Sequence, residues 1–265
     1  MTLIVGILCR DGVVMASDSA ATFAASGLPT IGQQKIPKIY NLSNAILYSN
    51  TGAVGIAQVI ANQIKMSWDN RELGGTKSPE EVMDRIGKKI SELLKPYLET
   101  AILTRQLVGE ALSSLCKSLV AMPVKQALYL FSFDYNGAPE RATQELPFVA
   151  MGSGQGIADP FLAFLKRLLV WEKNVPTLGE GRLAAVWTIK HAVLTNPEGV
   201  GGPIQLATLS MKEGKPTVTI IPEVDIQEHL QQIKAAEDAL TNELRTPGRP
   251  KELVPPEIPK VCGTT

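Results

Sequence analysis

The chain has 265 residues, of which 45% are hydrophobic, enough for one large folded domain or two smaller ones. Basic and acidic residues number 26 each, and this balance argues against binding to nucleic acid or to an anionic membrane surface. The three cysteines are far apart and only two histidines are present, so we expect reduced thiols, no metal and no other cofactor. Without a leader or a long apolar run, the protein is expected to be cytoplasmic.

We predict four strands before the first helix, joined by two tight turns and by a polar loop that contains Gly and Pro. Runs rich in Val, Ile and Leu, broken by turn-forming residues such as Arg10-Asp11-Gly12, support this prediction. The strands are residues 2–9, 12–19, 38–42 and 45–50, and the loop is 20–37.

Helical spacing of apolar residues follows and predicts a first helix over residues 53–68. Ser78 is expected to cap a second helix, with Glu81 completing a capping box. Pro96 is expected to kink or end that helix, and residues 98–122 continue in a helical register.

Strands and helices alternate in blocks through the second half of the chain. We expect strands over 126–135 and 147–154, helices over 159–173 and 179–196, and a last hairpin over 204–211 and 216–221. Blocks of this kind indicate antiparallel sheets covered by helices, which is an α+β layered architecture.

The C-terminal region differs from the rest in composition. Residues 225–245 read as a charged helix with a narrow apolar stripe, and residues 246–265 are rich in proline. We therefore predict a domain over 1–223 and an extension over 224–265. The extension is expected to pack against a neighbouring subunit or to line a shared cavity, and a solvated tail is the alternative.

Thr2 follows a single residue, Met1. A threonine hydroxyl is a weak nucleophile without a base, and a chain that begins with threonine carries a base in its own α-amino group. The reference pKa of that group, about 8, leaves part of it neutral near pH 7. Removal of Met1 would therefore create the nucleophile and its base together.

The stretch TLIVGILCRDGVVMASDSAAT, residues 2–22, resembles the start of proteasome β-subunits and of the related bacterial HslV-type peptidases. In those proteins an N-terminal threonine begins a hairpin that ends in an acidic residue. Three later stretches resemble the same family in the same order: KIPKIYNL (35–42) its essential lysine segment, SNTGAVG (49–55) its oxyanion glycine, and AMGSGQG (150–156) its Gly-Ser-Gly loop. The resemblance covers about residues 2–221.

This resemblance implies a role for each matching residue. Thr2 would be the nucleophile, and Asp18 would orient its amine and pair with Lys38, whose charge favours the ionised hydroxyl. Ser153 would hydrogen-bond the terminal amine. The backbone N–H of Gly52 would stabilise the oxyanion, because glycine lets a substrate carbonyl approach closely.

Substrate contacts are implied in the same way. Ala20 and Thr22 would flank the substrate as a strand edge, with main-chain hydrogen bonds giving recognition. Asn50 falls where the family shapes its first specificity pocket, and its amide suggests a preference for polar or small side chains.

Each of these residues also has a plainer interpretation. Asp18 fits a turn residue at a strand end, and Lys35 competes with Lys38 for the role of the essential lysine. Ser153 fits a helix cap or loop residue as well as a catalytic one. The two histidines, expected to be structural or solvated, are His191 and His229.

One segment departs from the family pattern. Proteasome subunits carry an Asp and a Ser before a late pair of glycines, where this chain has Pro197 and Val200. Part of the hydrogen-bond network that supports the site is thus missing or rebuilt. Asn196 and Glu198 are the candidates for supplying the replacement groups. Together with the long tail, this points to one of the less familiar bacterial relatives.

The resemblance implies an N-terminal nucleophile hydrolase sandwich, a four-layer αββα arrangement of two antiparallel sheets between helix layers. It implies a threonine endopeptidase that cleaves peptides or unfolded proteins through an acyl-enzyme ester. A homo-oligomeric stacked double ring is expected, with heptameric rings favoured over hexameric ones, and an ATP-dependent unfoldase is a candidate partner. No nucleic acid and no membrane is expected to bind.

Two other functions stay open at this stage. One is a catalytically weak ring subunit with a structural role, which is disfavoured because non-catalytic α-type subunits carry an extra helix before the hairpin. The other is a non-proteolytic amidase with the same nucleophile, since a fold does not fix its substrate.

Overall fold

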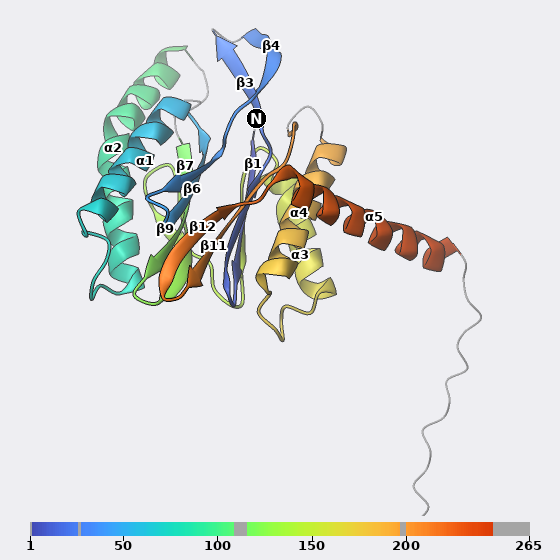
Figure 1. The fold of residues 1–265 in the computed structure, drawn as a ribbon. Helices are drawn as coiled ribbons and strands as arrows, with labels where there is room; N and C mark the ends of the chain where they lie inside the picture. The colour runs from blue at the N-terminus through green and yellow to red at the C-terminus, as the bar shows by residue number, and fades with distance from the viewer. Residues whose placement is uncertain (1, 26–27, 109–115, 197–199, 246–265) are drawn as a thin grey trace, which may run out of the picture.

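A computed structural model describes residues 2–25, 28–108, 116–196 and 200–245, with the backbone alone for 21–25, 28–35, 101 and 104–108. Two antiparallel five-stranded sheets face each other, and a pair of helices covers the outer face of each (Figure 1). The predicted four-layer αββα class is therefore confirmed.

The first sheet has the strand order β10-β1-β2-β11-β12. Its strands are β1 (Leu3–Cys9), β2 (Gly12–Ser17), β10 (Phe148–Gly152), β11 (Gln205–Lys212) and β12 (Lys215–Ile220). Helices α3 (Gln155–Leu168) and α4 (Leu178–Thr195) pack on its outer face. Alternate residues of β1, such as Val5 and Ile7, point to these helices and are fully buried.

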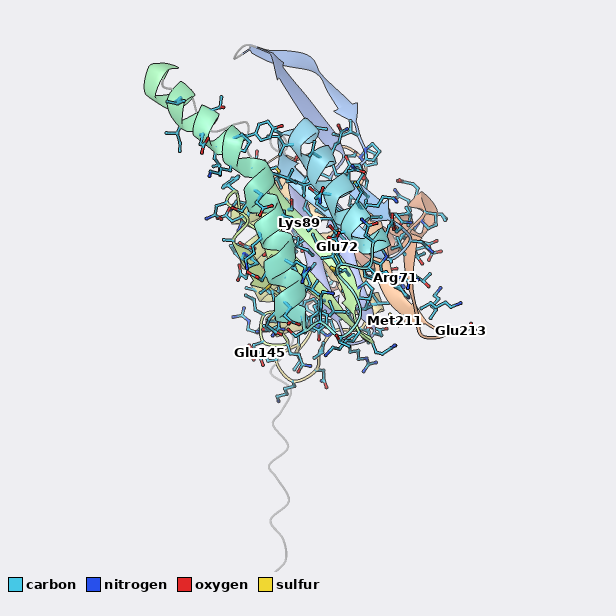
Figure 2. All side chains as sticks on the ribbon, turned by 90° about the vertical axis from the view of Figure 1, so that its left-hand side faces the viewer. Arg71, Glu72, Lys89, Glu145, Met211 and Glu213 are labelled. Carbon is cyan, nitrogen blue, oxygen red and sulfur yellow. The ribbon has the colours of Figure 1, made fainter. Side chains whose placement is uncertain are left out.

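The second sheet has the order β5-β6-β7-β8-β9. Its strands are β5 (Ile39–Leu42), β6 (Ile46–Gly52), β7 (Cys116–Val124), β8 (Ala127–Phe133) and β9 (Pro139–Arg141), covered by α1 (Val54–Asp69) and α2 (Pro79–Val108). Figure 2 shows this helical side, where Lys89 of α2 reaches Glu72 after α1 with Nζ 2.8 Å from Oε2. The predicted capping box of α2 is present, since Ser78 and Glu81 exchange hydrogen bonds.

The inner faces of the two sheets form a third apolar cluster, to which Ile4 of β1 and Leu119 of β7 contribute. Gly6 of β1 makes this close approach possible. A Cβ at Gly6 would lie 2.9 Å from side-chain carbons of both Leu119 and Leu130. The two sheets therefore pack closely face to face, and this packing fixes the positions of their strand ends relative to one another.

The predicted loop over 20–37 is wrong, because most of it forms a hairpin of β3 (Ala20–Ala25) and β4 (Leu28–Lys35). Six strands, not four, precede α1. The hairpin forms its own two-stranded sheet and projects beyond the sandwich (Figure 1). It therefore lacks the alternation of core-facing apolar residues on which strand prediction depends.

The helical prediction for residues 98–122 is also wrong in its second part. Helix α2 passes through Pro96 and ends at Val108, and β7 begins at Cys116. Strand β7 lies between β6 and β8 and is buried throughout except at Lys117. A continuous apolar run of this kind fits a buried strand and a buried helix equally well.

Helix α5 (Glu223–Arg245) packs against α4 of the same chain. Ile226 and Ile233 belong to the core beneath α4, and Glu237 accepts a hydrogen bond from Trp187 Nε1 at 3.0 Å. We expected the apolar stripe of this helix to pack against a neighbouring subunit or to line a shared cavity. For the first half of the helix this expectation is wrong, because the stripe packs against α4 of the same chain. Beyond it, Leu240 is 57% exposed. The division at residues 223 and 224 stays a prediction, and residues 246–265 lie outside the described part.

Two thiols lie in different layers of the sandwich. Cys9 is buried under α4, and Cys116 is buried in the cluster under α1 and α2. Cys262 lies outside the described residues. Within the described part of the chain, every helix is too short or too polar to cross a membrane.

Candidate active site

Asp18 is the centre of the polar contacts at one end of the sandwich. Its carboxylate is fully buried and accepts from four donors. Oδ1 accepts from the Leu3 N–H at 2.9 Å and from Lys38 Nζ at 2.7 Å. Oδ2 accepts from the N–H groups of Ala20 and Gly201, each at 3.2 Å. Four donors suit an ionised carboxylate, which only accepts, so Asp18 is more than a turn residue.

Lys38 lies just before β5 and is 5% exposed. Burial lowers its pKa, and the negative charge and hydrogen bond of Asp18 oppose this shift. The structure thus places Lys38, as predicted, against Asp18. Lys35, the competing candidate, pairs with Ala20 through the backbone of the β3–β4 hairpin, and its side chain is outside the described part.

The start of the chain is held by the loop after β10. The nitrogen of Thr2 donates to Ser153 Oγ at 3.1 Å, and its carbonyl oxygen lies 3.4 Å from both Ser153 Oγ and the Gly154 nitrogen. The N-cap of α3 is Gly154, without a side-chain cap, so Ser153 is no helix cap. A Cβ at Gly152 would lie 2.1 Å from the Thr2 carbonyl oxygen, and its φ is +102°, so this position requires glycine.

Gly52 ends β6 at the same edge of the sandwich. The methyl group of the preceding residue, Thr51, lies 3.4 Å from where a Cβ of Gly152 would stand. Gly52 itself has a φ of +100°, a conformation that glycine adopts without strain. Asn50 is half-buried on the same strand, and alternation places it on the face of Tyr48, toward α1 and α2.

The substrate-binding prediction is revised at Ala20. Its N–H donates to Asp18 and also to the carbonyl oxygen of Gly201, at 2.9 Å, so it is occupied within the chain. Thr22 pairs with Gln33 in the hairpin. The other edge of β3 has no strand beside it among the described residues, so that edge stays a candidate for binding an extended chain.

The segment that departs from the family pattern supports Asp18 through its backbone. Gly201 donates its N–H to the carboxylate, a contact that could not be predicted from the sequence because a backbone donor leaves no side-chain signal. Val200 is buried in the core, and its N–H donates to the carbonyl oxygen of Asn196 at 3.2 Å. Pro197 and Glu198 lie outside the described residues.

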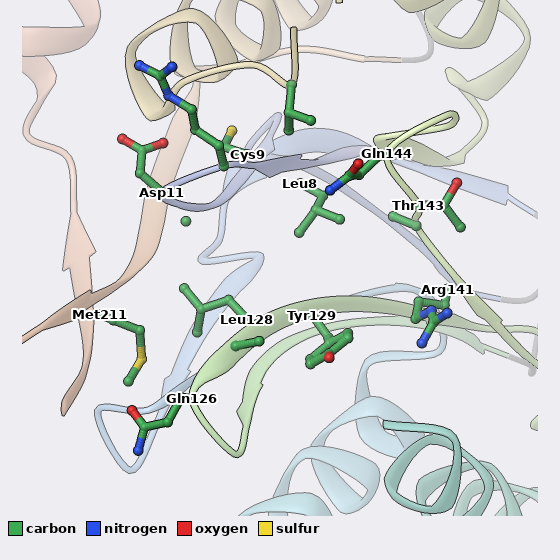
Figure 3. A pocket seen from close by; sticks show the side chains of 15 residues that line it. Leu8, Cys9, Asp11, Gln126, Leu128, Tyr129, Arg141, Thr143, Gln144 and Met211 are labelled. Atoms are coloured by element: carbon green, nitrogen blue, oxygen red, sulfur yellow. The ribbon is translucent and has the colours of Figure 1, made fainter. Parts of the chain in front are cut away.

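A cavity of about 810 Å³ lies at the opposite end of the sandwich (Figure 3). Two of its charged groups have structural partners. Arg141 Nη1 lies 2.7 Å from Oε1 of Glu80, and Asp11 accepts from the N–H of Leu178 at 2.8 Å. The histidines lie elsewhere, and His191 stacks on Phe161 with ring centroids 4.2 Å apart. We therefore place the candidate active site at the Thr2 end.

The Thr2 end brings together a hydroxyl side chain, a nitrogen held by Ser153, and a buried ammonium–carboxylate pair. Together with the αββα layers, this arrangement defines an N-terminal nucleophile hydrolase fold. The model of the proteasome subunit family matches residues 2–169, and the chain belongs to that family.

Individual relatives agree with this assignment. The proteasome subunit beta of Ferroglobus placidus is 28% identical over 157 residues, 59% of this chain and 65%, just under two thirds, of that protein. The proteasome subunit beta of Methanocaldococcus fervens is 27% identical over 232 residues, 88% of this chain and 90% of that protein. The solved structure of Anbu (ancestral beta-subunit) from Yersinia bercovieri shares the fold, with a TM-score of 0.65 and 16% identity over 92% of this chain and 97% of that one.

Proposed function

We propose that the protein is a threonine peptidase whose nucleophile is Thr2, exposed by removal of Met1. The observation that carries this proposal is the buried Asp18–Lys38 pair, hydrogen-bonded through Asp18 to the N–H of Leu3, the residue next to Thr2. A buried ion pair is costly to desolvate, so its position at the chain start favours a chemical role over a stabilising one.

The reaction proceeds in two steps. The freed amine of Thr2 takes the proton of Oγ1 while Oγ1 attacks the scissile carbonyl, and the Lys38 ammonium favours the ionised oxygen. The N–H of Gly52 stabilises the oxyanion. The amine then protonates the leaving nitrogen, which gives an ester on Thr2 and the first product. Water hydrolyses the ester, releases the carboxylic acid and regenerates the hydroxyl.

The test combines intact mass measurement with N-terminal sequencing after treatment with a peptide epoxyketone, which bonds to both the hydroxyl and the amine of an N-terminal threonine. We expect one adduct on a chain that begins at Thr2, and none on Thr2→Ala. Thr208→Ala, a threonine on β11, is the matched control and should label like the parent protein. A fully active protein that retains Met1 would overturn the mechanism.

Peptide cleavage is the proposed activity because β3 begins beside Asp18 and one of its edges has no strand next to it in the part of the chain that the structure describes. Fluorogenic peptides of three or four residues should therefore be cleaved faster than small amides that have no backbone to pair. The reverse order would favour the amidase alternative. Thr22 and Asn50 are the proposed substrate contacts in this arrangement.

We further propose that the chain assembles as a homo-oligomeric stacked double ring, with seven-membered rings favoured, which encloses the sites. Family membership supports the ring, and exposed apolar side chains on α1, such as Val59 at 46%, offer contact surface. Light scattering would measure the particle mass as a multiple of 28.5 kDa. A monomer at micromolar concentration would contradict this assembly.

The role of α5 in assembly needs a sharper test than truncation after Glu223, since that cut removes Ile226 and Ile233 from the core. Leu240→Ser and Leu244→Ser change only its exposed end, where these side chains are 57% and 74% exposed. A smaller particle mass in both variants would assign this end to subunit contacts. An unchanged mass and unchanged cleavage of an unfolded protein would exclude it.

A further inference from the structure

The segment Ile36–Lys38 connects the β3–β4 hairpin to β5 and carries the lysine of the site. It lies outside every strand, so its backbone polar groups need other partners. The Ile36 N–H donates to the carbonyl oxygen of Ser19 at 3.1 Å. The Lys38 carbonyl oxygen accepts from Ser49 Oγ at 2.6 Å. Three groups remain: the Pro37 carbonyl and, on either side of it, the Ile36 carbonyl and the Lys38 N–H.

One side chain supplies the partners of the two groups that flank Pro37. Gln205 Nε2 donates to the Ile36 carbonyl oxygen at 2.6 Å, and Gln205 Oε1 accepts from the Lys38 N–H at 2.9 Å. A carbonyl and an N–H are complementary to only one orientation of the amide, so the oxygen and nitrogen of Gln205 are fixed by their partners. The amide thus holds the backbone on either side of Pro37, as a neighbouring strand would.

These contacts join the two sheets at the site. Gln205 begins β11 of the first sheet, next to β2 with Ser17 as its register partner, and Ser49 belongs to β6 of the second sheet. The Lys38 backbone is therefore held from both sheets, and its side chain crosses to Asp18 after β2. The position of the ammonium depends on this double attachment.

We propose that Gln205 is a positioning residue for Lys38, with Ser49 as its counterpart on the other sheet. The inference rests on the proposed function for its effect on rate. Gln205 does not touch the reacting atoms. It holds the main chain so that the Lys38 ammonium stays within hydrogen-bonding distance of Asp18 Oδ1, the same oxygen that accepts from the N–H of Leu3. Small displacements of such groups are costly, since a shift of about 1 Å can reduce a rate about 100-fold.

The main variant is Gln205→Met, which keeps the length of the side chain and removes both hydrogen bonds. We expect kcat for a fluorogenic peptide to fall about 10-fold or more, with KM changed less than about twofold, because substrate contacts are left intact. Thr208→Val, a nearly isosteric change on the same strand, is the control and should keep the parent kcat. Ser49→Ala should lower kcat in the same direction as Gln205→Met.

Gln205→Glu adds a readout that a purely structural role would not produce. A protonated carboxyl group can donate to the Ile36 carbonyl and accept from the Lys38 N–H, as the amide does, whereas a carboxylate can only accept. The kcat of Gln205→Glu relative to the parent protein should therefore rise as the pH falls from 8 to 5.5. The same ratio for Gln205→Met should stay constant.

A crystal structure of Gln205→Met tests the positioning independently of activity. In the parent protein Lys38 Nζ lies 2.7 Å from Asp18 Oδ1, and in the variant this contact should be broken or the side chain disordered. An unchanged contact, or a variant with parent kcat, would overturn the proposal. If Lys38 moves in the variant while the parent protein neither cleaves peptides nor takes the epoxyketone, the positioning stands and the proposed function fails.

Discussion

The β1–β2 hairpin has two ends of opposite character. At the Thr2 end, Asp18 is fully buried and Lys38 nearly so, and their polar groups bond to one another and to backbone N–H groups. At the turn end, Arg10 and Asp11 are exposed beside a cavity of about 810 Å³. The charges beside the large cavity are exposed to water, whereas the charges at the Thr2 end, where we propose that the reaction takes place, are buried.

If the proposed function is correct, cavity volume is a poor guide to the active site in this fold. A substrate that pairs with a strand edge needs no deep pocket in one chain, whereas a nucleophile needs neighbours whose charge is not screened by water. Burial of convergent polar groups is therefore the better criterion here. The following variants test whether the two ends differ as this criterion requires.

The largest effect is expected at Lys38. Lys38→Ala should lower kcat/KM about 100-fold or more, because the charge that favours the ionised Thr2 oxygen is lost. It should also lower the free energy of unfolding by about 3–5 kcal/mol, since Asp18 is left buried without its counter-ion. Peptide kinetics and urea unfolding measure both. Lys35→Ala is the matched control, and loss of activity there instead would show that the wrong lysine was assigned.

Substitutions at two glycines distinguish an effect on stability from an effect on the reaction. Gly152→Ala places a Cβ 2.1 Å from the Thr2 carbonyl oxygen, and Gly12→Ala places one 2.6 Å from the Leu209 carbonyl oxygen at the far end. Both should lower the free energy of unfolding, by about 2–5 and about 1–3 kcal/mol respectively. Only Gly152→Ala should slow epoxyketone labelling of the folded protein. Equal labelling rates in both variants would argue against a site at Thr2.

The alkaline limb of the pH profile should belong to Lys38. Burial lowers the pKa of this group from its usual 10.5, so the neutral amine accumulates at a lower pH than for an exposed lysine. Because the ammonium is the active form, kcat/KM should fall about tenfold per pH unit above that pKa. Lys38→Arg keeps its charge and should move the limb to higher pH. If the alkaline limb of Lys38→Arg stays at the same pH as in the parent protein, the limb arises from the titration of another group.

The smallest effect is expected at the far end. Arg141→Ala removes a solvent-exposed ion pair with Glu80, which should leave the unfolding free energy nearly unchanged because water screens such pairs. It should leave kcat/KM within about twofold of the parent value, since no described contact links Arg141 to the Thr2 end. A clear loss of peptide cleavage in this variant would mean that the cavity takes part in the reaction.

The blocks of strands and helices in the sequence indicated an α+β layered architecture, because alternating or continuous apolar runs mark strands that touch the core. The four-layer order and the pairing of Asp18 with Lys38 were implied by the family resemblance. The β3–β4 hairpin was missed because it joins neither five-stranded sheet. Strand β7 was missed because a fully buried strand has no period that distinguishes it from a helix.

Within the site, the contacts that could not be predicted from the sequence all involve the backbone, either as the group that supports a side chain or as the group that a side chain supports. Gly201 supports Asp18 with an N–H, and Gln205 and Ser49 hold the main chain around Lys38. Such roles depend on where a group lies in space, and neither residue type nor spacing reveals them. For the same reason the sequence alone did not show that the N–H of Ala20 is already occupied.

The two buried thiols allow the halves of the sandwich to be followed separately during unfolding. Burial raises the pKa of Cys116 to about 11 and also raises that of Cys9, so an alkylating reagent, which reacts with thiolate, modifies each only after local opening. Because Cys9 lies under α4 and Cys116 under α1 and α2, their modification rates report the opening free energies of the two helix–sheet layers. Equal rates in a Cys262→Ser background would mean that the sandwich opens as one cooperative unit, and unequal rates would identify which layer separates first.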